Sequence, residues 1–286
     1  MGEGLLVKSP ASQKYYDEAR EILGFDLLHL CLTGPADQLN RTEFSQPALF
    51  VHSLAAFGHL LEQRPQIWDS VTAVAGLSLG EFTAITVAGG LTFADGLRLV
   101  QTRGLAMQAA ADQVASGMSS IIGLELEKLR AVCREASKET EFVEVSNLLC
   151  PGNIAISGHV SAIQRAETAA IAAGALKAVR LAVAGAFHTA LMQPAVARLT
   201  EALASAEFRK TRVPVYSNVD AAPHTDPEEI RSLLARQIVT PVLWEDTLRN
   251  LLAAGRDAFM EIGAGKVLAG TLKRVDRKAA CESFGD

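Results

Sequence analysis

Residues 71–88 contain the feature that most constrains the fold, a Gly-x-Ser-x-Gly motif between a strand signal and a helix signal. The β-prone run over residues 71–75 ends at the motif, and a helix-like segment follows over residues 80–88. This order is typical of a nucleophile elbow, a sharp turn that holds a strained serine at its apex. We therefore expect Ser78 at the apex, with both motif glycines where a Cβ would clash with the neighbouring strand and helix.

The start of the predicted helix has a consequence for chemistry at Ser78. The first N–H groups of a helix have no partner inside the helix, so they would point towards the serine oxygen. The N–H of Leu79 would then be one donor of an oxyanion hole. The motif alone does not separate a nucleophile from a structural turn, because chance matches are common in a chain with 22 glycines. The strand and helix signals on the correct sides favour the nucleophile.

The loop that ends in His188 supplies a candidate base. A serine hydroxyl is a weak nucleophile and needs an adjacent base. His188 follows Gly185-Ala186-Phe187, and a histidine after the serine is the chain order of hydrolase-like elbows. A triad also needs an acid, for which Asp95, Asp112 and several glutamates are candidates without a distinctive setting. The alternative is that a backbone carbonyl orients the imidazole.

Arg103 lies on a predicted helix over residues 93–110 and suggests the kind of acyl group. A guanidinium can bind a carboxylate through two parallel hydrogen bonds. Close to an elbow serine, Arg103 would suit an acyl group that carries its own free carboxylate. The alternative is an ordinary surface arginine on the polar face of the helix.

The order of the remaining elements predicts an α/β fold with two subdomains. Strands separated by helices indicate a parallel α/β sheet. Residues 116–183 read strand-helix-strand-strand-helix-strand, the ferredoxin-like pattern. We therefore expect a ferredoxin-like subdomain over residues 116–183, inserted into a hydrolase-like subdomain formed by residues 1–115 and 184–286.

Outside the insertion, further helices and strands are expected at defined places. Pro47 should open a helix over residues 48–61, because proline suits the first turn. The last dozen residues are charged and should be frayed. The other expected helices span residues 10–30, 189–206, 227–238, 244–254 and 267–273, and the other expected strands span residues 213–217 and 258–262.

The bulk composition excludes several classes of function. The chain has 286 residues, 49% of them hydrophobic, and a net charge of −5, which argues against nucleic acid or an anionic membrane as the main partner. No apolar run reaches the roughly 18 residues of a membrane span. The N-terminus lacks the basic-then-apolar pattern of a signal peptide. The four cysteines are scattered and the histidines form no metal motif, which indicates reduced thiols in a cytoplasmic protein.

Short segments along nearly the whole chain carry a family resemblance. They are Thr42…Gln46-Pro47-Ala48, Gly76-Leu77-Ser78-Leu79-Gly80-Glu81, Gln101-Thr102-Arg103-Gly104-Leu105-Ala106-Met107, Pro151-Gly152-Asn153, Ala186-Phe187-His188, Ser217-Asn218-Val219, Gln237…Pro241-Val242…Trp244 and Glu261-Ile262-Gly263-Ala264-Gly265-Lys266-Val267-Leu268. Together they resemble the malonyl-CoA:acyl carrier protein transacylase family of fatty acid and polyketide synthesis. So many matches in order are far more specific than the serine motif alone.

This resemblance implies a mechanism. Ser78 attacks the malonyl thioester and His188 takes its proton, so that a malonyl–serine ester forms and CoA leaves. The phosphopantetheine thiol of acyl carrier protein then enters, with His188 acting in reverse and no further cofactor. The main-chain carbonyl at Gln237 orients the histidine. The implied substrate-binding residues are Arg103, Gln237, Phe187 and Met107, with Arg103 on the malonate carboxylate and the Phe187 ring crowding any α-methyl group.

Two departures from the family pattern stand out. Leu77 replaces the histidine that usually precedes the nucleophile, and we expect little loss of chemistry from this change. The chain starts at Met1-Gly2, which resembles the segment just after the family's Phe-Pro-Gly-Gln-Gly loop, whose glutamine N–H is the second oxyanion donor. We expect either that the true start lies upstream or that the missing strand and loop impair the chain. Loss of one such donor costs about 100- to 1,000-fold in rate. The alternatives to malonyl transfer are a serine thioesterase or esterase, and a truncated non-catalytic homologue that binds acyl carrier protein.

Overall fold

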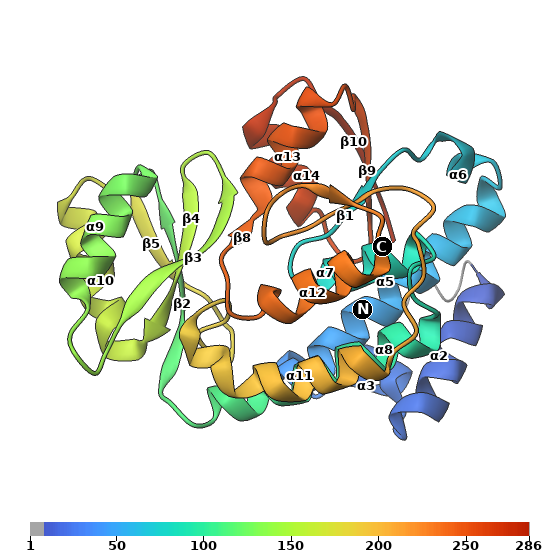
Figure 1. The fold of residues 1–286 in the computed structure, drawn as a ribbon, viewed down its shortest axis with the longest axis horizontal. Coiled ribbons are helices and arrows are strands. Elements are labelled where there is room, and N and C mark those ends of the chain that lie inside the picture. The colour runs from blue at the N-terminus through green and yellow to red at the C-terminus, as the bar shows by residue number, and fades with distance from the viewer. Residues whose placement is uncertain (1–8, 286) are drawn as a thin grey trace.

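The computed structural model describes residues 9–285, so the expectations about Met1-Gly2 lie outside the described residues. Figure 1 shows a smaller part, a sheet with two helices on one side, next to a larger and mostly helical part. The elements before the smaller part are α2 (Pro10–Leu23), α3 (Leu27–Thr33), α4 (Ala36–Asn40), α5 (Thr42–Gln63), α6 (Ile67–Ser70), β1 (Val74–Ala75), α7 (Leu79–Val87) and α8 (Phe93–Ala111).

The chain returns to the larger part after residue 180. Its elements there are the 3₁₀ helix η1 (Ala190–Met192), α11 (Gln193–Ser205), β6 (Val215–Tyr216), β7 (Pro223–His224), α12 (Pro227–Gln237), β8 (Val242–Leu243), α13 (Trp244–Ala253), β9 (Ala258–Ile262), α14 (Val267–Val275) and β10 (Ala280–Phe284). β1 pairs with β6 in parallel and β7 adds to β6 antiparallel, while β9 and β10 form a separate parallel pair. This part therefore contains one short mixed sheet and one parallel pair rather than a single parallel sheet.

The smaller part has the predicted ferredoxin-like order. It consists of β2 (Ser116–Ile122), α9 (Leu126–Ala136), β3 (Val143–Cys150), β4 (Asn153–His159), α10 (Val160–Ala172) and β5 (Lys177–Arg180). The four strands are antiparallel in the order β5-β2-β4-β3, and aliphatic side chains such as Ile121, Ile156 and Ile163 fill its core. β8 continues this sheet, parallel to β3. The ferredoxin-like pattern is confirmed, and the domain boundaries at residues 115/116 and 183/184 stay a prediction.

The core of the larger part is built around α5 and α8. α5 is apolar around most of its circumference and is correspondingly buried. The two helices approach closely at Gly104 of α8, where a Cβ would lie 2.8 Å from the Thr42 carbonyl oxygen. Thr92 caps the start of α8, as its hydroxyl accepts from the Asp95 N–H at 3.1 Å. This packing places the middle of α8 beside the start of α7.

Three expectations about single elements are wrong. The helix predicted over residues 10–30 is two helices, because Gly24 adopts a φ of 78° and ends α2. Pro47 lies inside α5 and does not open it, since the helix starts at Thr42, whose N–H is satisfied by the Gln108 Oε1 of α8 at 3.1 Å. The described residues near the end of the chain are not frayed, because β10 pairs with β9 along its whole length.

Candidate active site

Ser78 sits at the junction of β1 and α7 in the strained backbone expected of an elbow. Its φ of 51° and ψ of −103° are unusual for a residue with a side chain. At Gly76 a Cβ would overlap the carbonyl of Gly80, so the turn requires glycine there. The same expectation for Gly80 is wrong, because a Cβ at that position would meet open space. The tight contact of the elbow is thus between the backbone of residue 76 and that of residue 80.

His188 faces the serine directly. Its Nε2 lies 2.8 Å from the Ser78 Oγ, and its Nδ1 lies 2.9 Å from the main-chain carbonyl oxygen of Gln237. Because a carbonyl only accepts, Nδ1 carries the proton, and Nε2 is left to accept from the serine hydroxyl. Burial, together with the nearby Arg103 cation, lowers the pKa of His188 to about 4. The imidazole is therefore neutral at pH 7 and able to take a proton.

The two aspartates considered as orienting acids are engaged elsewhere. Asp95 pairs with Thr92 at the start of α8, and Asp112 accepts from Gln108. The place of a triad acid next to His188 is filled by the Gln237 carbonyl, at the end of α12. Of the two alternatives in the sequence, the geometry therefore matches the backbone carbonyl.

Arg103 is buried, with only 1% of its surface exposed, and its guanidinium reaches the nucleophile. Its Nη2 donates to the Ser78 Oγ and to the Gln237 Oε1, both at 2.9 Å. Its Nη1 donates to the Gln46 Oε1 at 2.7 Å, and its Nε has no partner among the described residues. Burial lowers the pKa of Arg103 to about 10, so it stays charged at pH 7. The alternative of an ordinary surface arginine is excluded.

The other expected site residues lie around this cluster. Phe187 precedes His188 and is partly buried against the core of the larger part. Met107 is fully buried, and its Sδ accepts from the Gln46 Nε2 at 3.4 Å, so it contacts the site through Gln46. Leu79 is the first residue of α7, and its N–H has no partner inside the helix. Leu77 packs against a hydrophobic cluster that includes Trp244, which accounts for an apolar residue before the nucleophile.

Two polar residues that the sequence did not single out hold the elbow in place. The Asn218 Oδ1 accepts from the Ser78 N–H at 2.6 Å, and its Nδ2 donates to the Gly76 carbonyl at 2.7 Å. The Glu81 Oε2 accepts from the Gln237 Nε2 at 2.8 Å and from the Asn218 N–H at 3.1 Å. Burial raises the pKa of Glu81 to about 7. Both residues lie in family-like segments, but neither forms a spacing pattern that signals a function.

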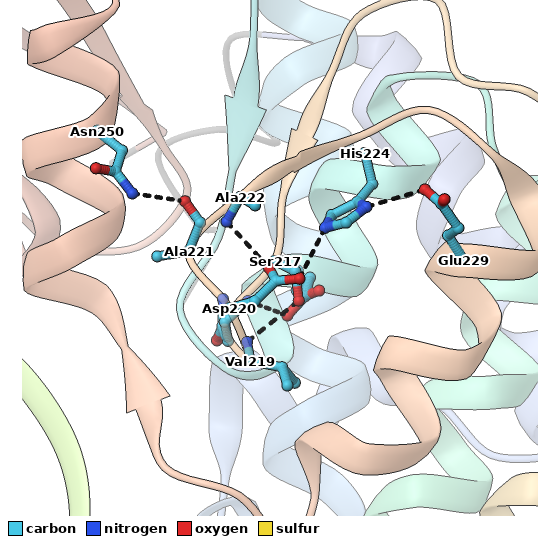
Figure 2. A network of polar contacts seen from close by, with 10 residues as sticks. Ser217, Val219, Asp220, Ala221, Ala222, His224, Glu229 and Asn250 are labelled. Carbon is cyan, nitrogen blue, oxygen red and sulfur yellow. Dashed lines mark hydrogen bonds and ion pairs between the residues drawn. The ribbon is translucent and has the colours of Figure 1, made fainter.

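The turn that follows Asn218 is held by its own polar network, which Figure 2 shows. The Val219 N–H donates to the Ser217 Oγ at 3.1 Å, and the Asn250 Nδ2 donates to the Ala221 carbonyl at 3.0 Å. The two ring nitrogens of His224 lie 3.0 Å from the Asp220 Oδ2 and 3.1 Å from the Glu229 Oε2 (Figure 2). The backbone that carries Asn218 is therefore fixed from α12 and α13.

The described residues offer no obvious place for a metal ion. Within residues 9–285, no group of three or more His, Cys, Asp or Glu side chains is arranged to hold one. A search of the same residues for a helix long and apolar enough to cross a bilayer finds none. What the site presents is a serine hydroxyl in hydrogen-bond contact with both an imidazole and a guanidinium.

Comparison with known proteins gives consistent matches. The acyl transferase domain family matches residues 1–283. A human protein named malonyl-CoA-acyl carrier protein transacylase, mitochondrial, is 41% identical over 98% of this chain and 74% of its own length. The Bacillus subtilis malonyl CoA-acyl carrier protein transacylase is 37% identical over 100% of this chain and 89% of its own.

A solved structure extends the match to three dimensions. It is a malonyl-transacylase in complex with a type II PKS acyl-carrier protein. This chain superposes on it with a TM-score of 0.92 and 35% identity, over 99% of this chain and 90% of that one. Agreement at this level over nearly the whole chain confirms the predicted hydrolase-like α/β fold with its ferredoxin-like insertion.

Proposed function

The chain belongs to the acyl transferase domain family, and from this we propose that it transfers a malonyl group from malonyl-CoA to the phosphopantetheine thiol of acyl carrier protein. The observation that carries the proposal is the buried Arg103 guanidinium in hydrogen-bond contact with the Ser78 hydroxyl. A buried cation at the nucleophile suits an acyl group that ends in a carboxylate. A simple esterase would have no use for it.

In the first half-reaction the Ser78 Oγ attacks the thioester carbonyl while its proton passes to the His188 Nε2. The Leu79 N–H donates to the oxyanion of the tetrahedral intermediate. When the intermediate collapses, the C–S bond breaks and the departing CoA thiolate takes the proton from His188. A malonyl–Ser78 ester remains. The Gln237 carbonyl stabilises the imidazolium that forms in between, because it accepts from Nδ1–H.

In the second half-reaction the thiol of acyl carrier protein gives its proton to the His188 Nε2 and attacks the ester. The new C–S bond forms, and the Ser78 oxygen leaves with the proton of the imidazolium. Each step moves only an acyl group and a proton, so the scheme uses no cofactor. Two successive substrates at one serine imply ping-pong kinetics.

Substrate selection falls to the residues around the serine. Arg103 holds the malonyl carboxylate, and its buried Nε–H, which no described residue accepts, is one donor available for it. Phe187 excludes an α-methyl group by the bulk of its ring, while Met107 supports the site through its contact with Gln46. A cytoplasmic location is part of the proposal, supported by the match to a bacterial transacylase, although the human relative is named as mitochondrial.

Intact-protein mass spectrometry tests this function. Wild-type protein mixed with malonyl-CoA should gain the mass of one malonyl group, and Ser78→Ala should gain none. Adding phosphopantetheinylated acyl carrier protein should then move the group to the carrier thiol. A Ser78→Ala chain that still gains malonyl mass would contradict the mechanism. Release of free malonate faster than transfer to the carrier would favour a thioesterase.

A further inference from the structure

Glu81 is a fully buried acid that the proposed reaction does not use. It lies in the first turn of α7, three residues after Ser78, and is only 2% exposed. Among the described residues, its carboxylate makes no ion pair and accepts hydrogen bonds from the Gln237 amide and the Asn218 N–H. Burying a carboxylate without a direct cationic partner is costly unless its hydrogen bonds are well used. The hydrogen bonds of the Glu81 carboxylate should therefore serve a purpose that offsets the cost of burying it.

The first bond fixes the side-chain amide of Gln237. The Gln237 Nε2 donates to the Glu81 Oε2 at 2.8 Å and to the Ser78 carbonyl at 2.9 Å, and its Oε1 accepts from the Arg103 Nη2 at 2.9 Å. With the amide turned over, its NH₂ would face the guanidinium and its oxygen would face two acceptors. Since a carboxylate only accepts, Glu81 and Arg103 together permit a single orientation of this amide.

The second bond reaches the backbone of the elbow. The Glu81 Oε2 also accepts from the Asn218 N–H, and the Asn218 side chain clasps the Ser78 N–H and the Gly76 carbonyl. The Glu81 Oε2 therefore links Gln237, which contacts Arg103, with Asn218, which holds the backbone around Ser78. Among residues 9–285, the hydrogen-bond acceptors that Arg103 contacts are all neutral, so the position of its charge depends on how firmly they are held.

We propose that Glu81 is a positioning residue for acyl-group selection: it holds the Gln237 amide in the orientation that fixes the Arg103 guanidinium beside Ser78. The inference rests on the proposed malonyl transfer. A positioning role for Glu81 differs from a purely structural role in its effect on substrate preference. Loss of Glu81 should harm substrates with a terminal carboxylate far more than substrates without one, because the His188 orientation depends on the Gln237 main chain and not on its amide.

Steady-state kinetics with malonyl-CoA and acetyl-CoA separate the two roles. Glu81→Leu should lower kcat/KM for malonyl-CoA by about 10- to 100-fold, mainly through KM, with a change of less than about threefold for acetyl-CoA. Glu81→Gln should largely restore the ratio of kcat/KM for malonyl-CoA to kcat/KM for acetyl-CoA, because an amide oxygen can accept the same two bonds. Adding Arg103→Met to Glu81→Leu should lower the ratio by less than the product of the two single effects.

Glu261 provides a matched control. It is also a buried glutamate, and its two oxygens accept from the Leu268 and Ala269 N–H groups at 2.8 and 2.9 Å, at the start of α14. Glu261→Leu should lower the thermal stability without changing the malonyl-to-acetyl ratio. Should Glu81→Leu fail to fold, Gln237→Leu removes the same link while keeping the carbonyl that His188 needs. Equal losses for both substrates in Glu81→Leu, or an unchanged ratio in Gln237→Leu, would overturn the proposal.

Binding of free malonate, measured by calorimetry, gives a readout that does not depend on transfer. Wild-type protein should bind malonate more tightly than acetate, and Glu81→Leu should lose about tenfold in malonate affinity while Glu261→Leu does not. Malonate binding that is as tight in Glu81→Leu as in wild type would overturn the role of Glu81. A wild-type protein that shows Glu81-dependent malonate binding but forms no malonyl–Ser78 ester would instead overturn the proposed function alone.

Discussion

The ferredoxin-like sheet and the region around Ser78 bury different kinds of side chain. The sheet packs aliphatic groups such as Ile121 and Ile156 against α9 and α10. The region around Ser78 buries an arginine, a glutamate and a histidine that are joined by amide side chains. Aliphatic packing is non-directional, so many side chains of similar volume would serve. Each buried polar group has one set of partners, so a substitution there should change chemistry more than stability.

The sharpest test of this difference compares two histidines. His188→Ala should lower kcat for malonyl transfer by about 10⁴- to 10⁶-fold, because the serine loses its base. His159 belongs to the ferredoxin-like sheet, where its Nδ1 contacts the backbone of Phe142. His159→Gln should leave kcat within about twofold, as it touches no reacting group. Stopped-flow transfer assays measure both, and comparable losses in the two variants would remove the contrast between the regions.

A core substitution in the sheet should show the opposite behaviour. Ile156→Ala should lower the free energy of unfolding by about 2–5 kcal/mol, because it opens a cavity in a fully buried position. Transfer activity per folded molecule should not change. Urea unfolding followed by circular dichroism gives the first quantity, and active-site titration with malonyl-CoA gives the second. A change in the malonyl-to-acetyl ratio would show that the sheet contributes to selection.

A smaller effect is expected at Phe187. Phe187→Ala should reduce the preference for malonyl-CoA over methylmalonyl-CoA by about tenfold, because the space for one methyl group is gained. Phe142→Ala, which removes an aromatic ring in the smaller part, is the matched control and should leave this preference unchanged. Competition between the two thioesters in one reaction reports the preference directly. An unchanged preference for malonyl-CoA over methylmalonyl-CoA in Phe187→Ala would show that another residue excludes the α-methyl group.

The pH dependence should be the smallest effect. Because the pKa of His188 is about 4, kcat/KM should hold down to about pH 5 and fall below it as the imidazole protonates. Arg103→Met removes a cation that lowers this pKa, so the acid limb measured with acetyl-CoA should move to higher pH. An acid limb already near the ordinary histidine value in wild type would show that the imidazole is not buried as described.

The pH dependence of folding stability should have opposite signs for His188 and Glu81. The unfolded state takes up a proton at His188 between pH 6.5 and 4 that the folded state does not, so this group costs stability as the pH falls. Glu81 has a raised pKa of about 7, so the unfolded state loses its proton first and stability falls as the pH rises from 4.5 to 7. Both groups therefore cost stability between pH 4.5 and 6.5, and their opposite pH slopes cancel in that range.

Much of this architecture could be predicted from local patterns. The helix α7, the capped helix α8 and the order of the ferredoxin-like strands follow from periodicity, caps and turns, which are local in the chain. Ser78, His188 and Arg103 could be named because each lies in a recognisable motif, and the structure brings all three into contact. Their catalytic and binding roles stay predictions.

What could not be predicted depends on partners distant in sequence. The start of α5 is set by Gln108 of α8, and residues 280–284 are ordered because they pair with β9. The roles of Glu81 and Asn218 arise from bonds that span more than 130 residues of chain. Such bonds produce no periodic pattern or motif spacing in the sequence, so Glu81 cannot be distinguished there from an ordinary helical glutamate.

The short strand β8 has a mechanical consequence. By chain it belongs with α12 and α13, but it is bonded to the edge of the ferredoxin-like sheet, and its Leu243 N–H also donates to the Asn218 carbonyl at 2.9 Å. Any movement of the smaller part relative to the larger one must therefore either break the pairing of β8 with β3 or displace Asn218, which holds the backbone around Ser78. A force on that sheet would reach the nucleophile through two residues, Leu243 and Asn218.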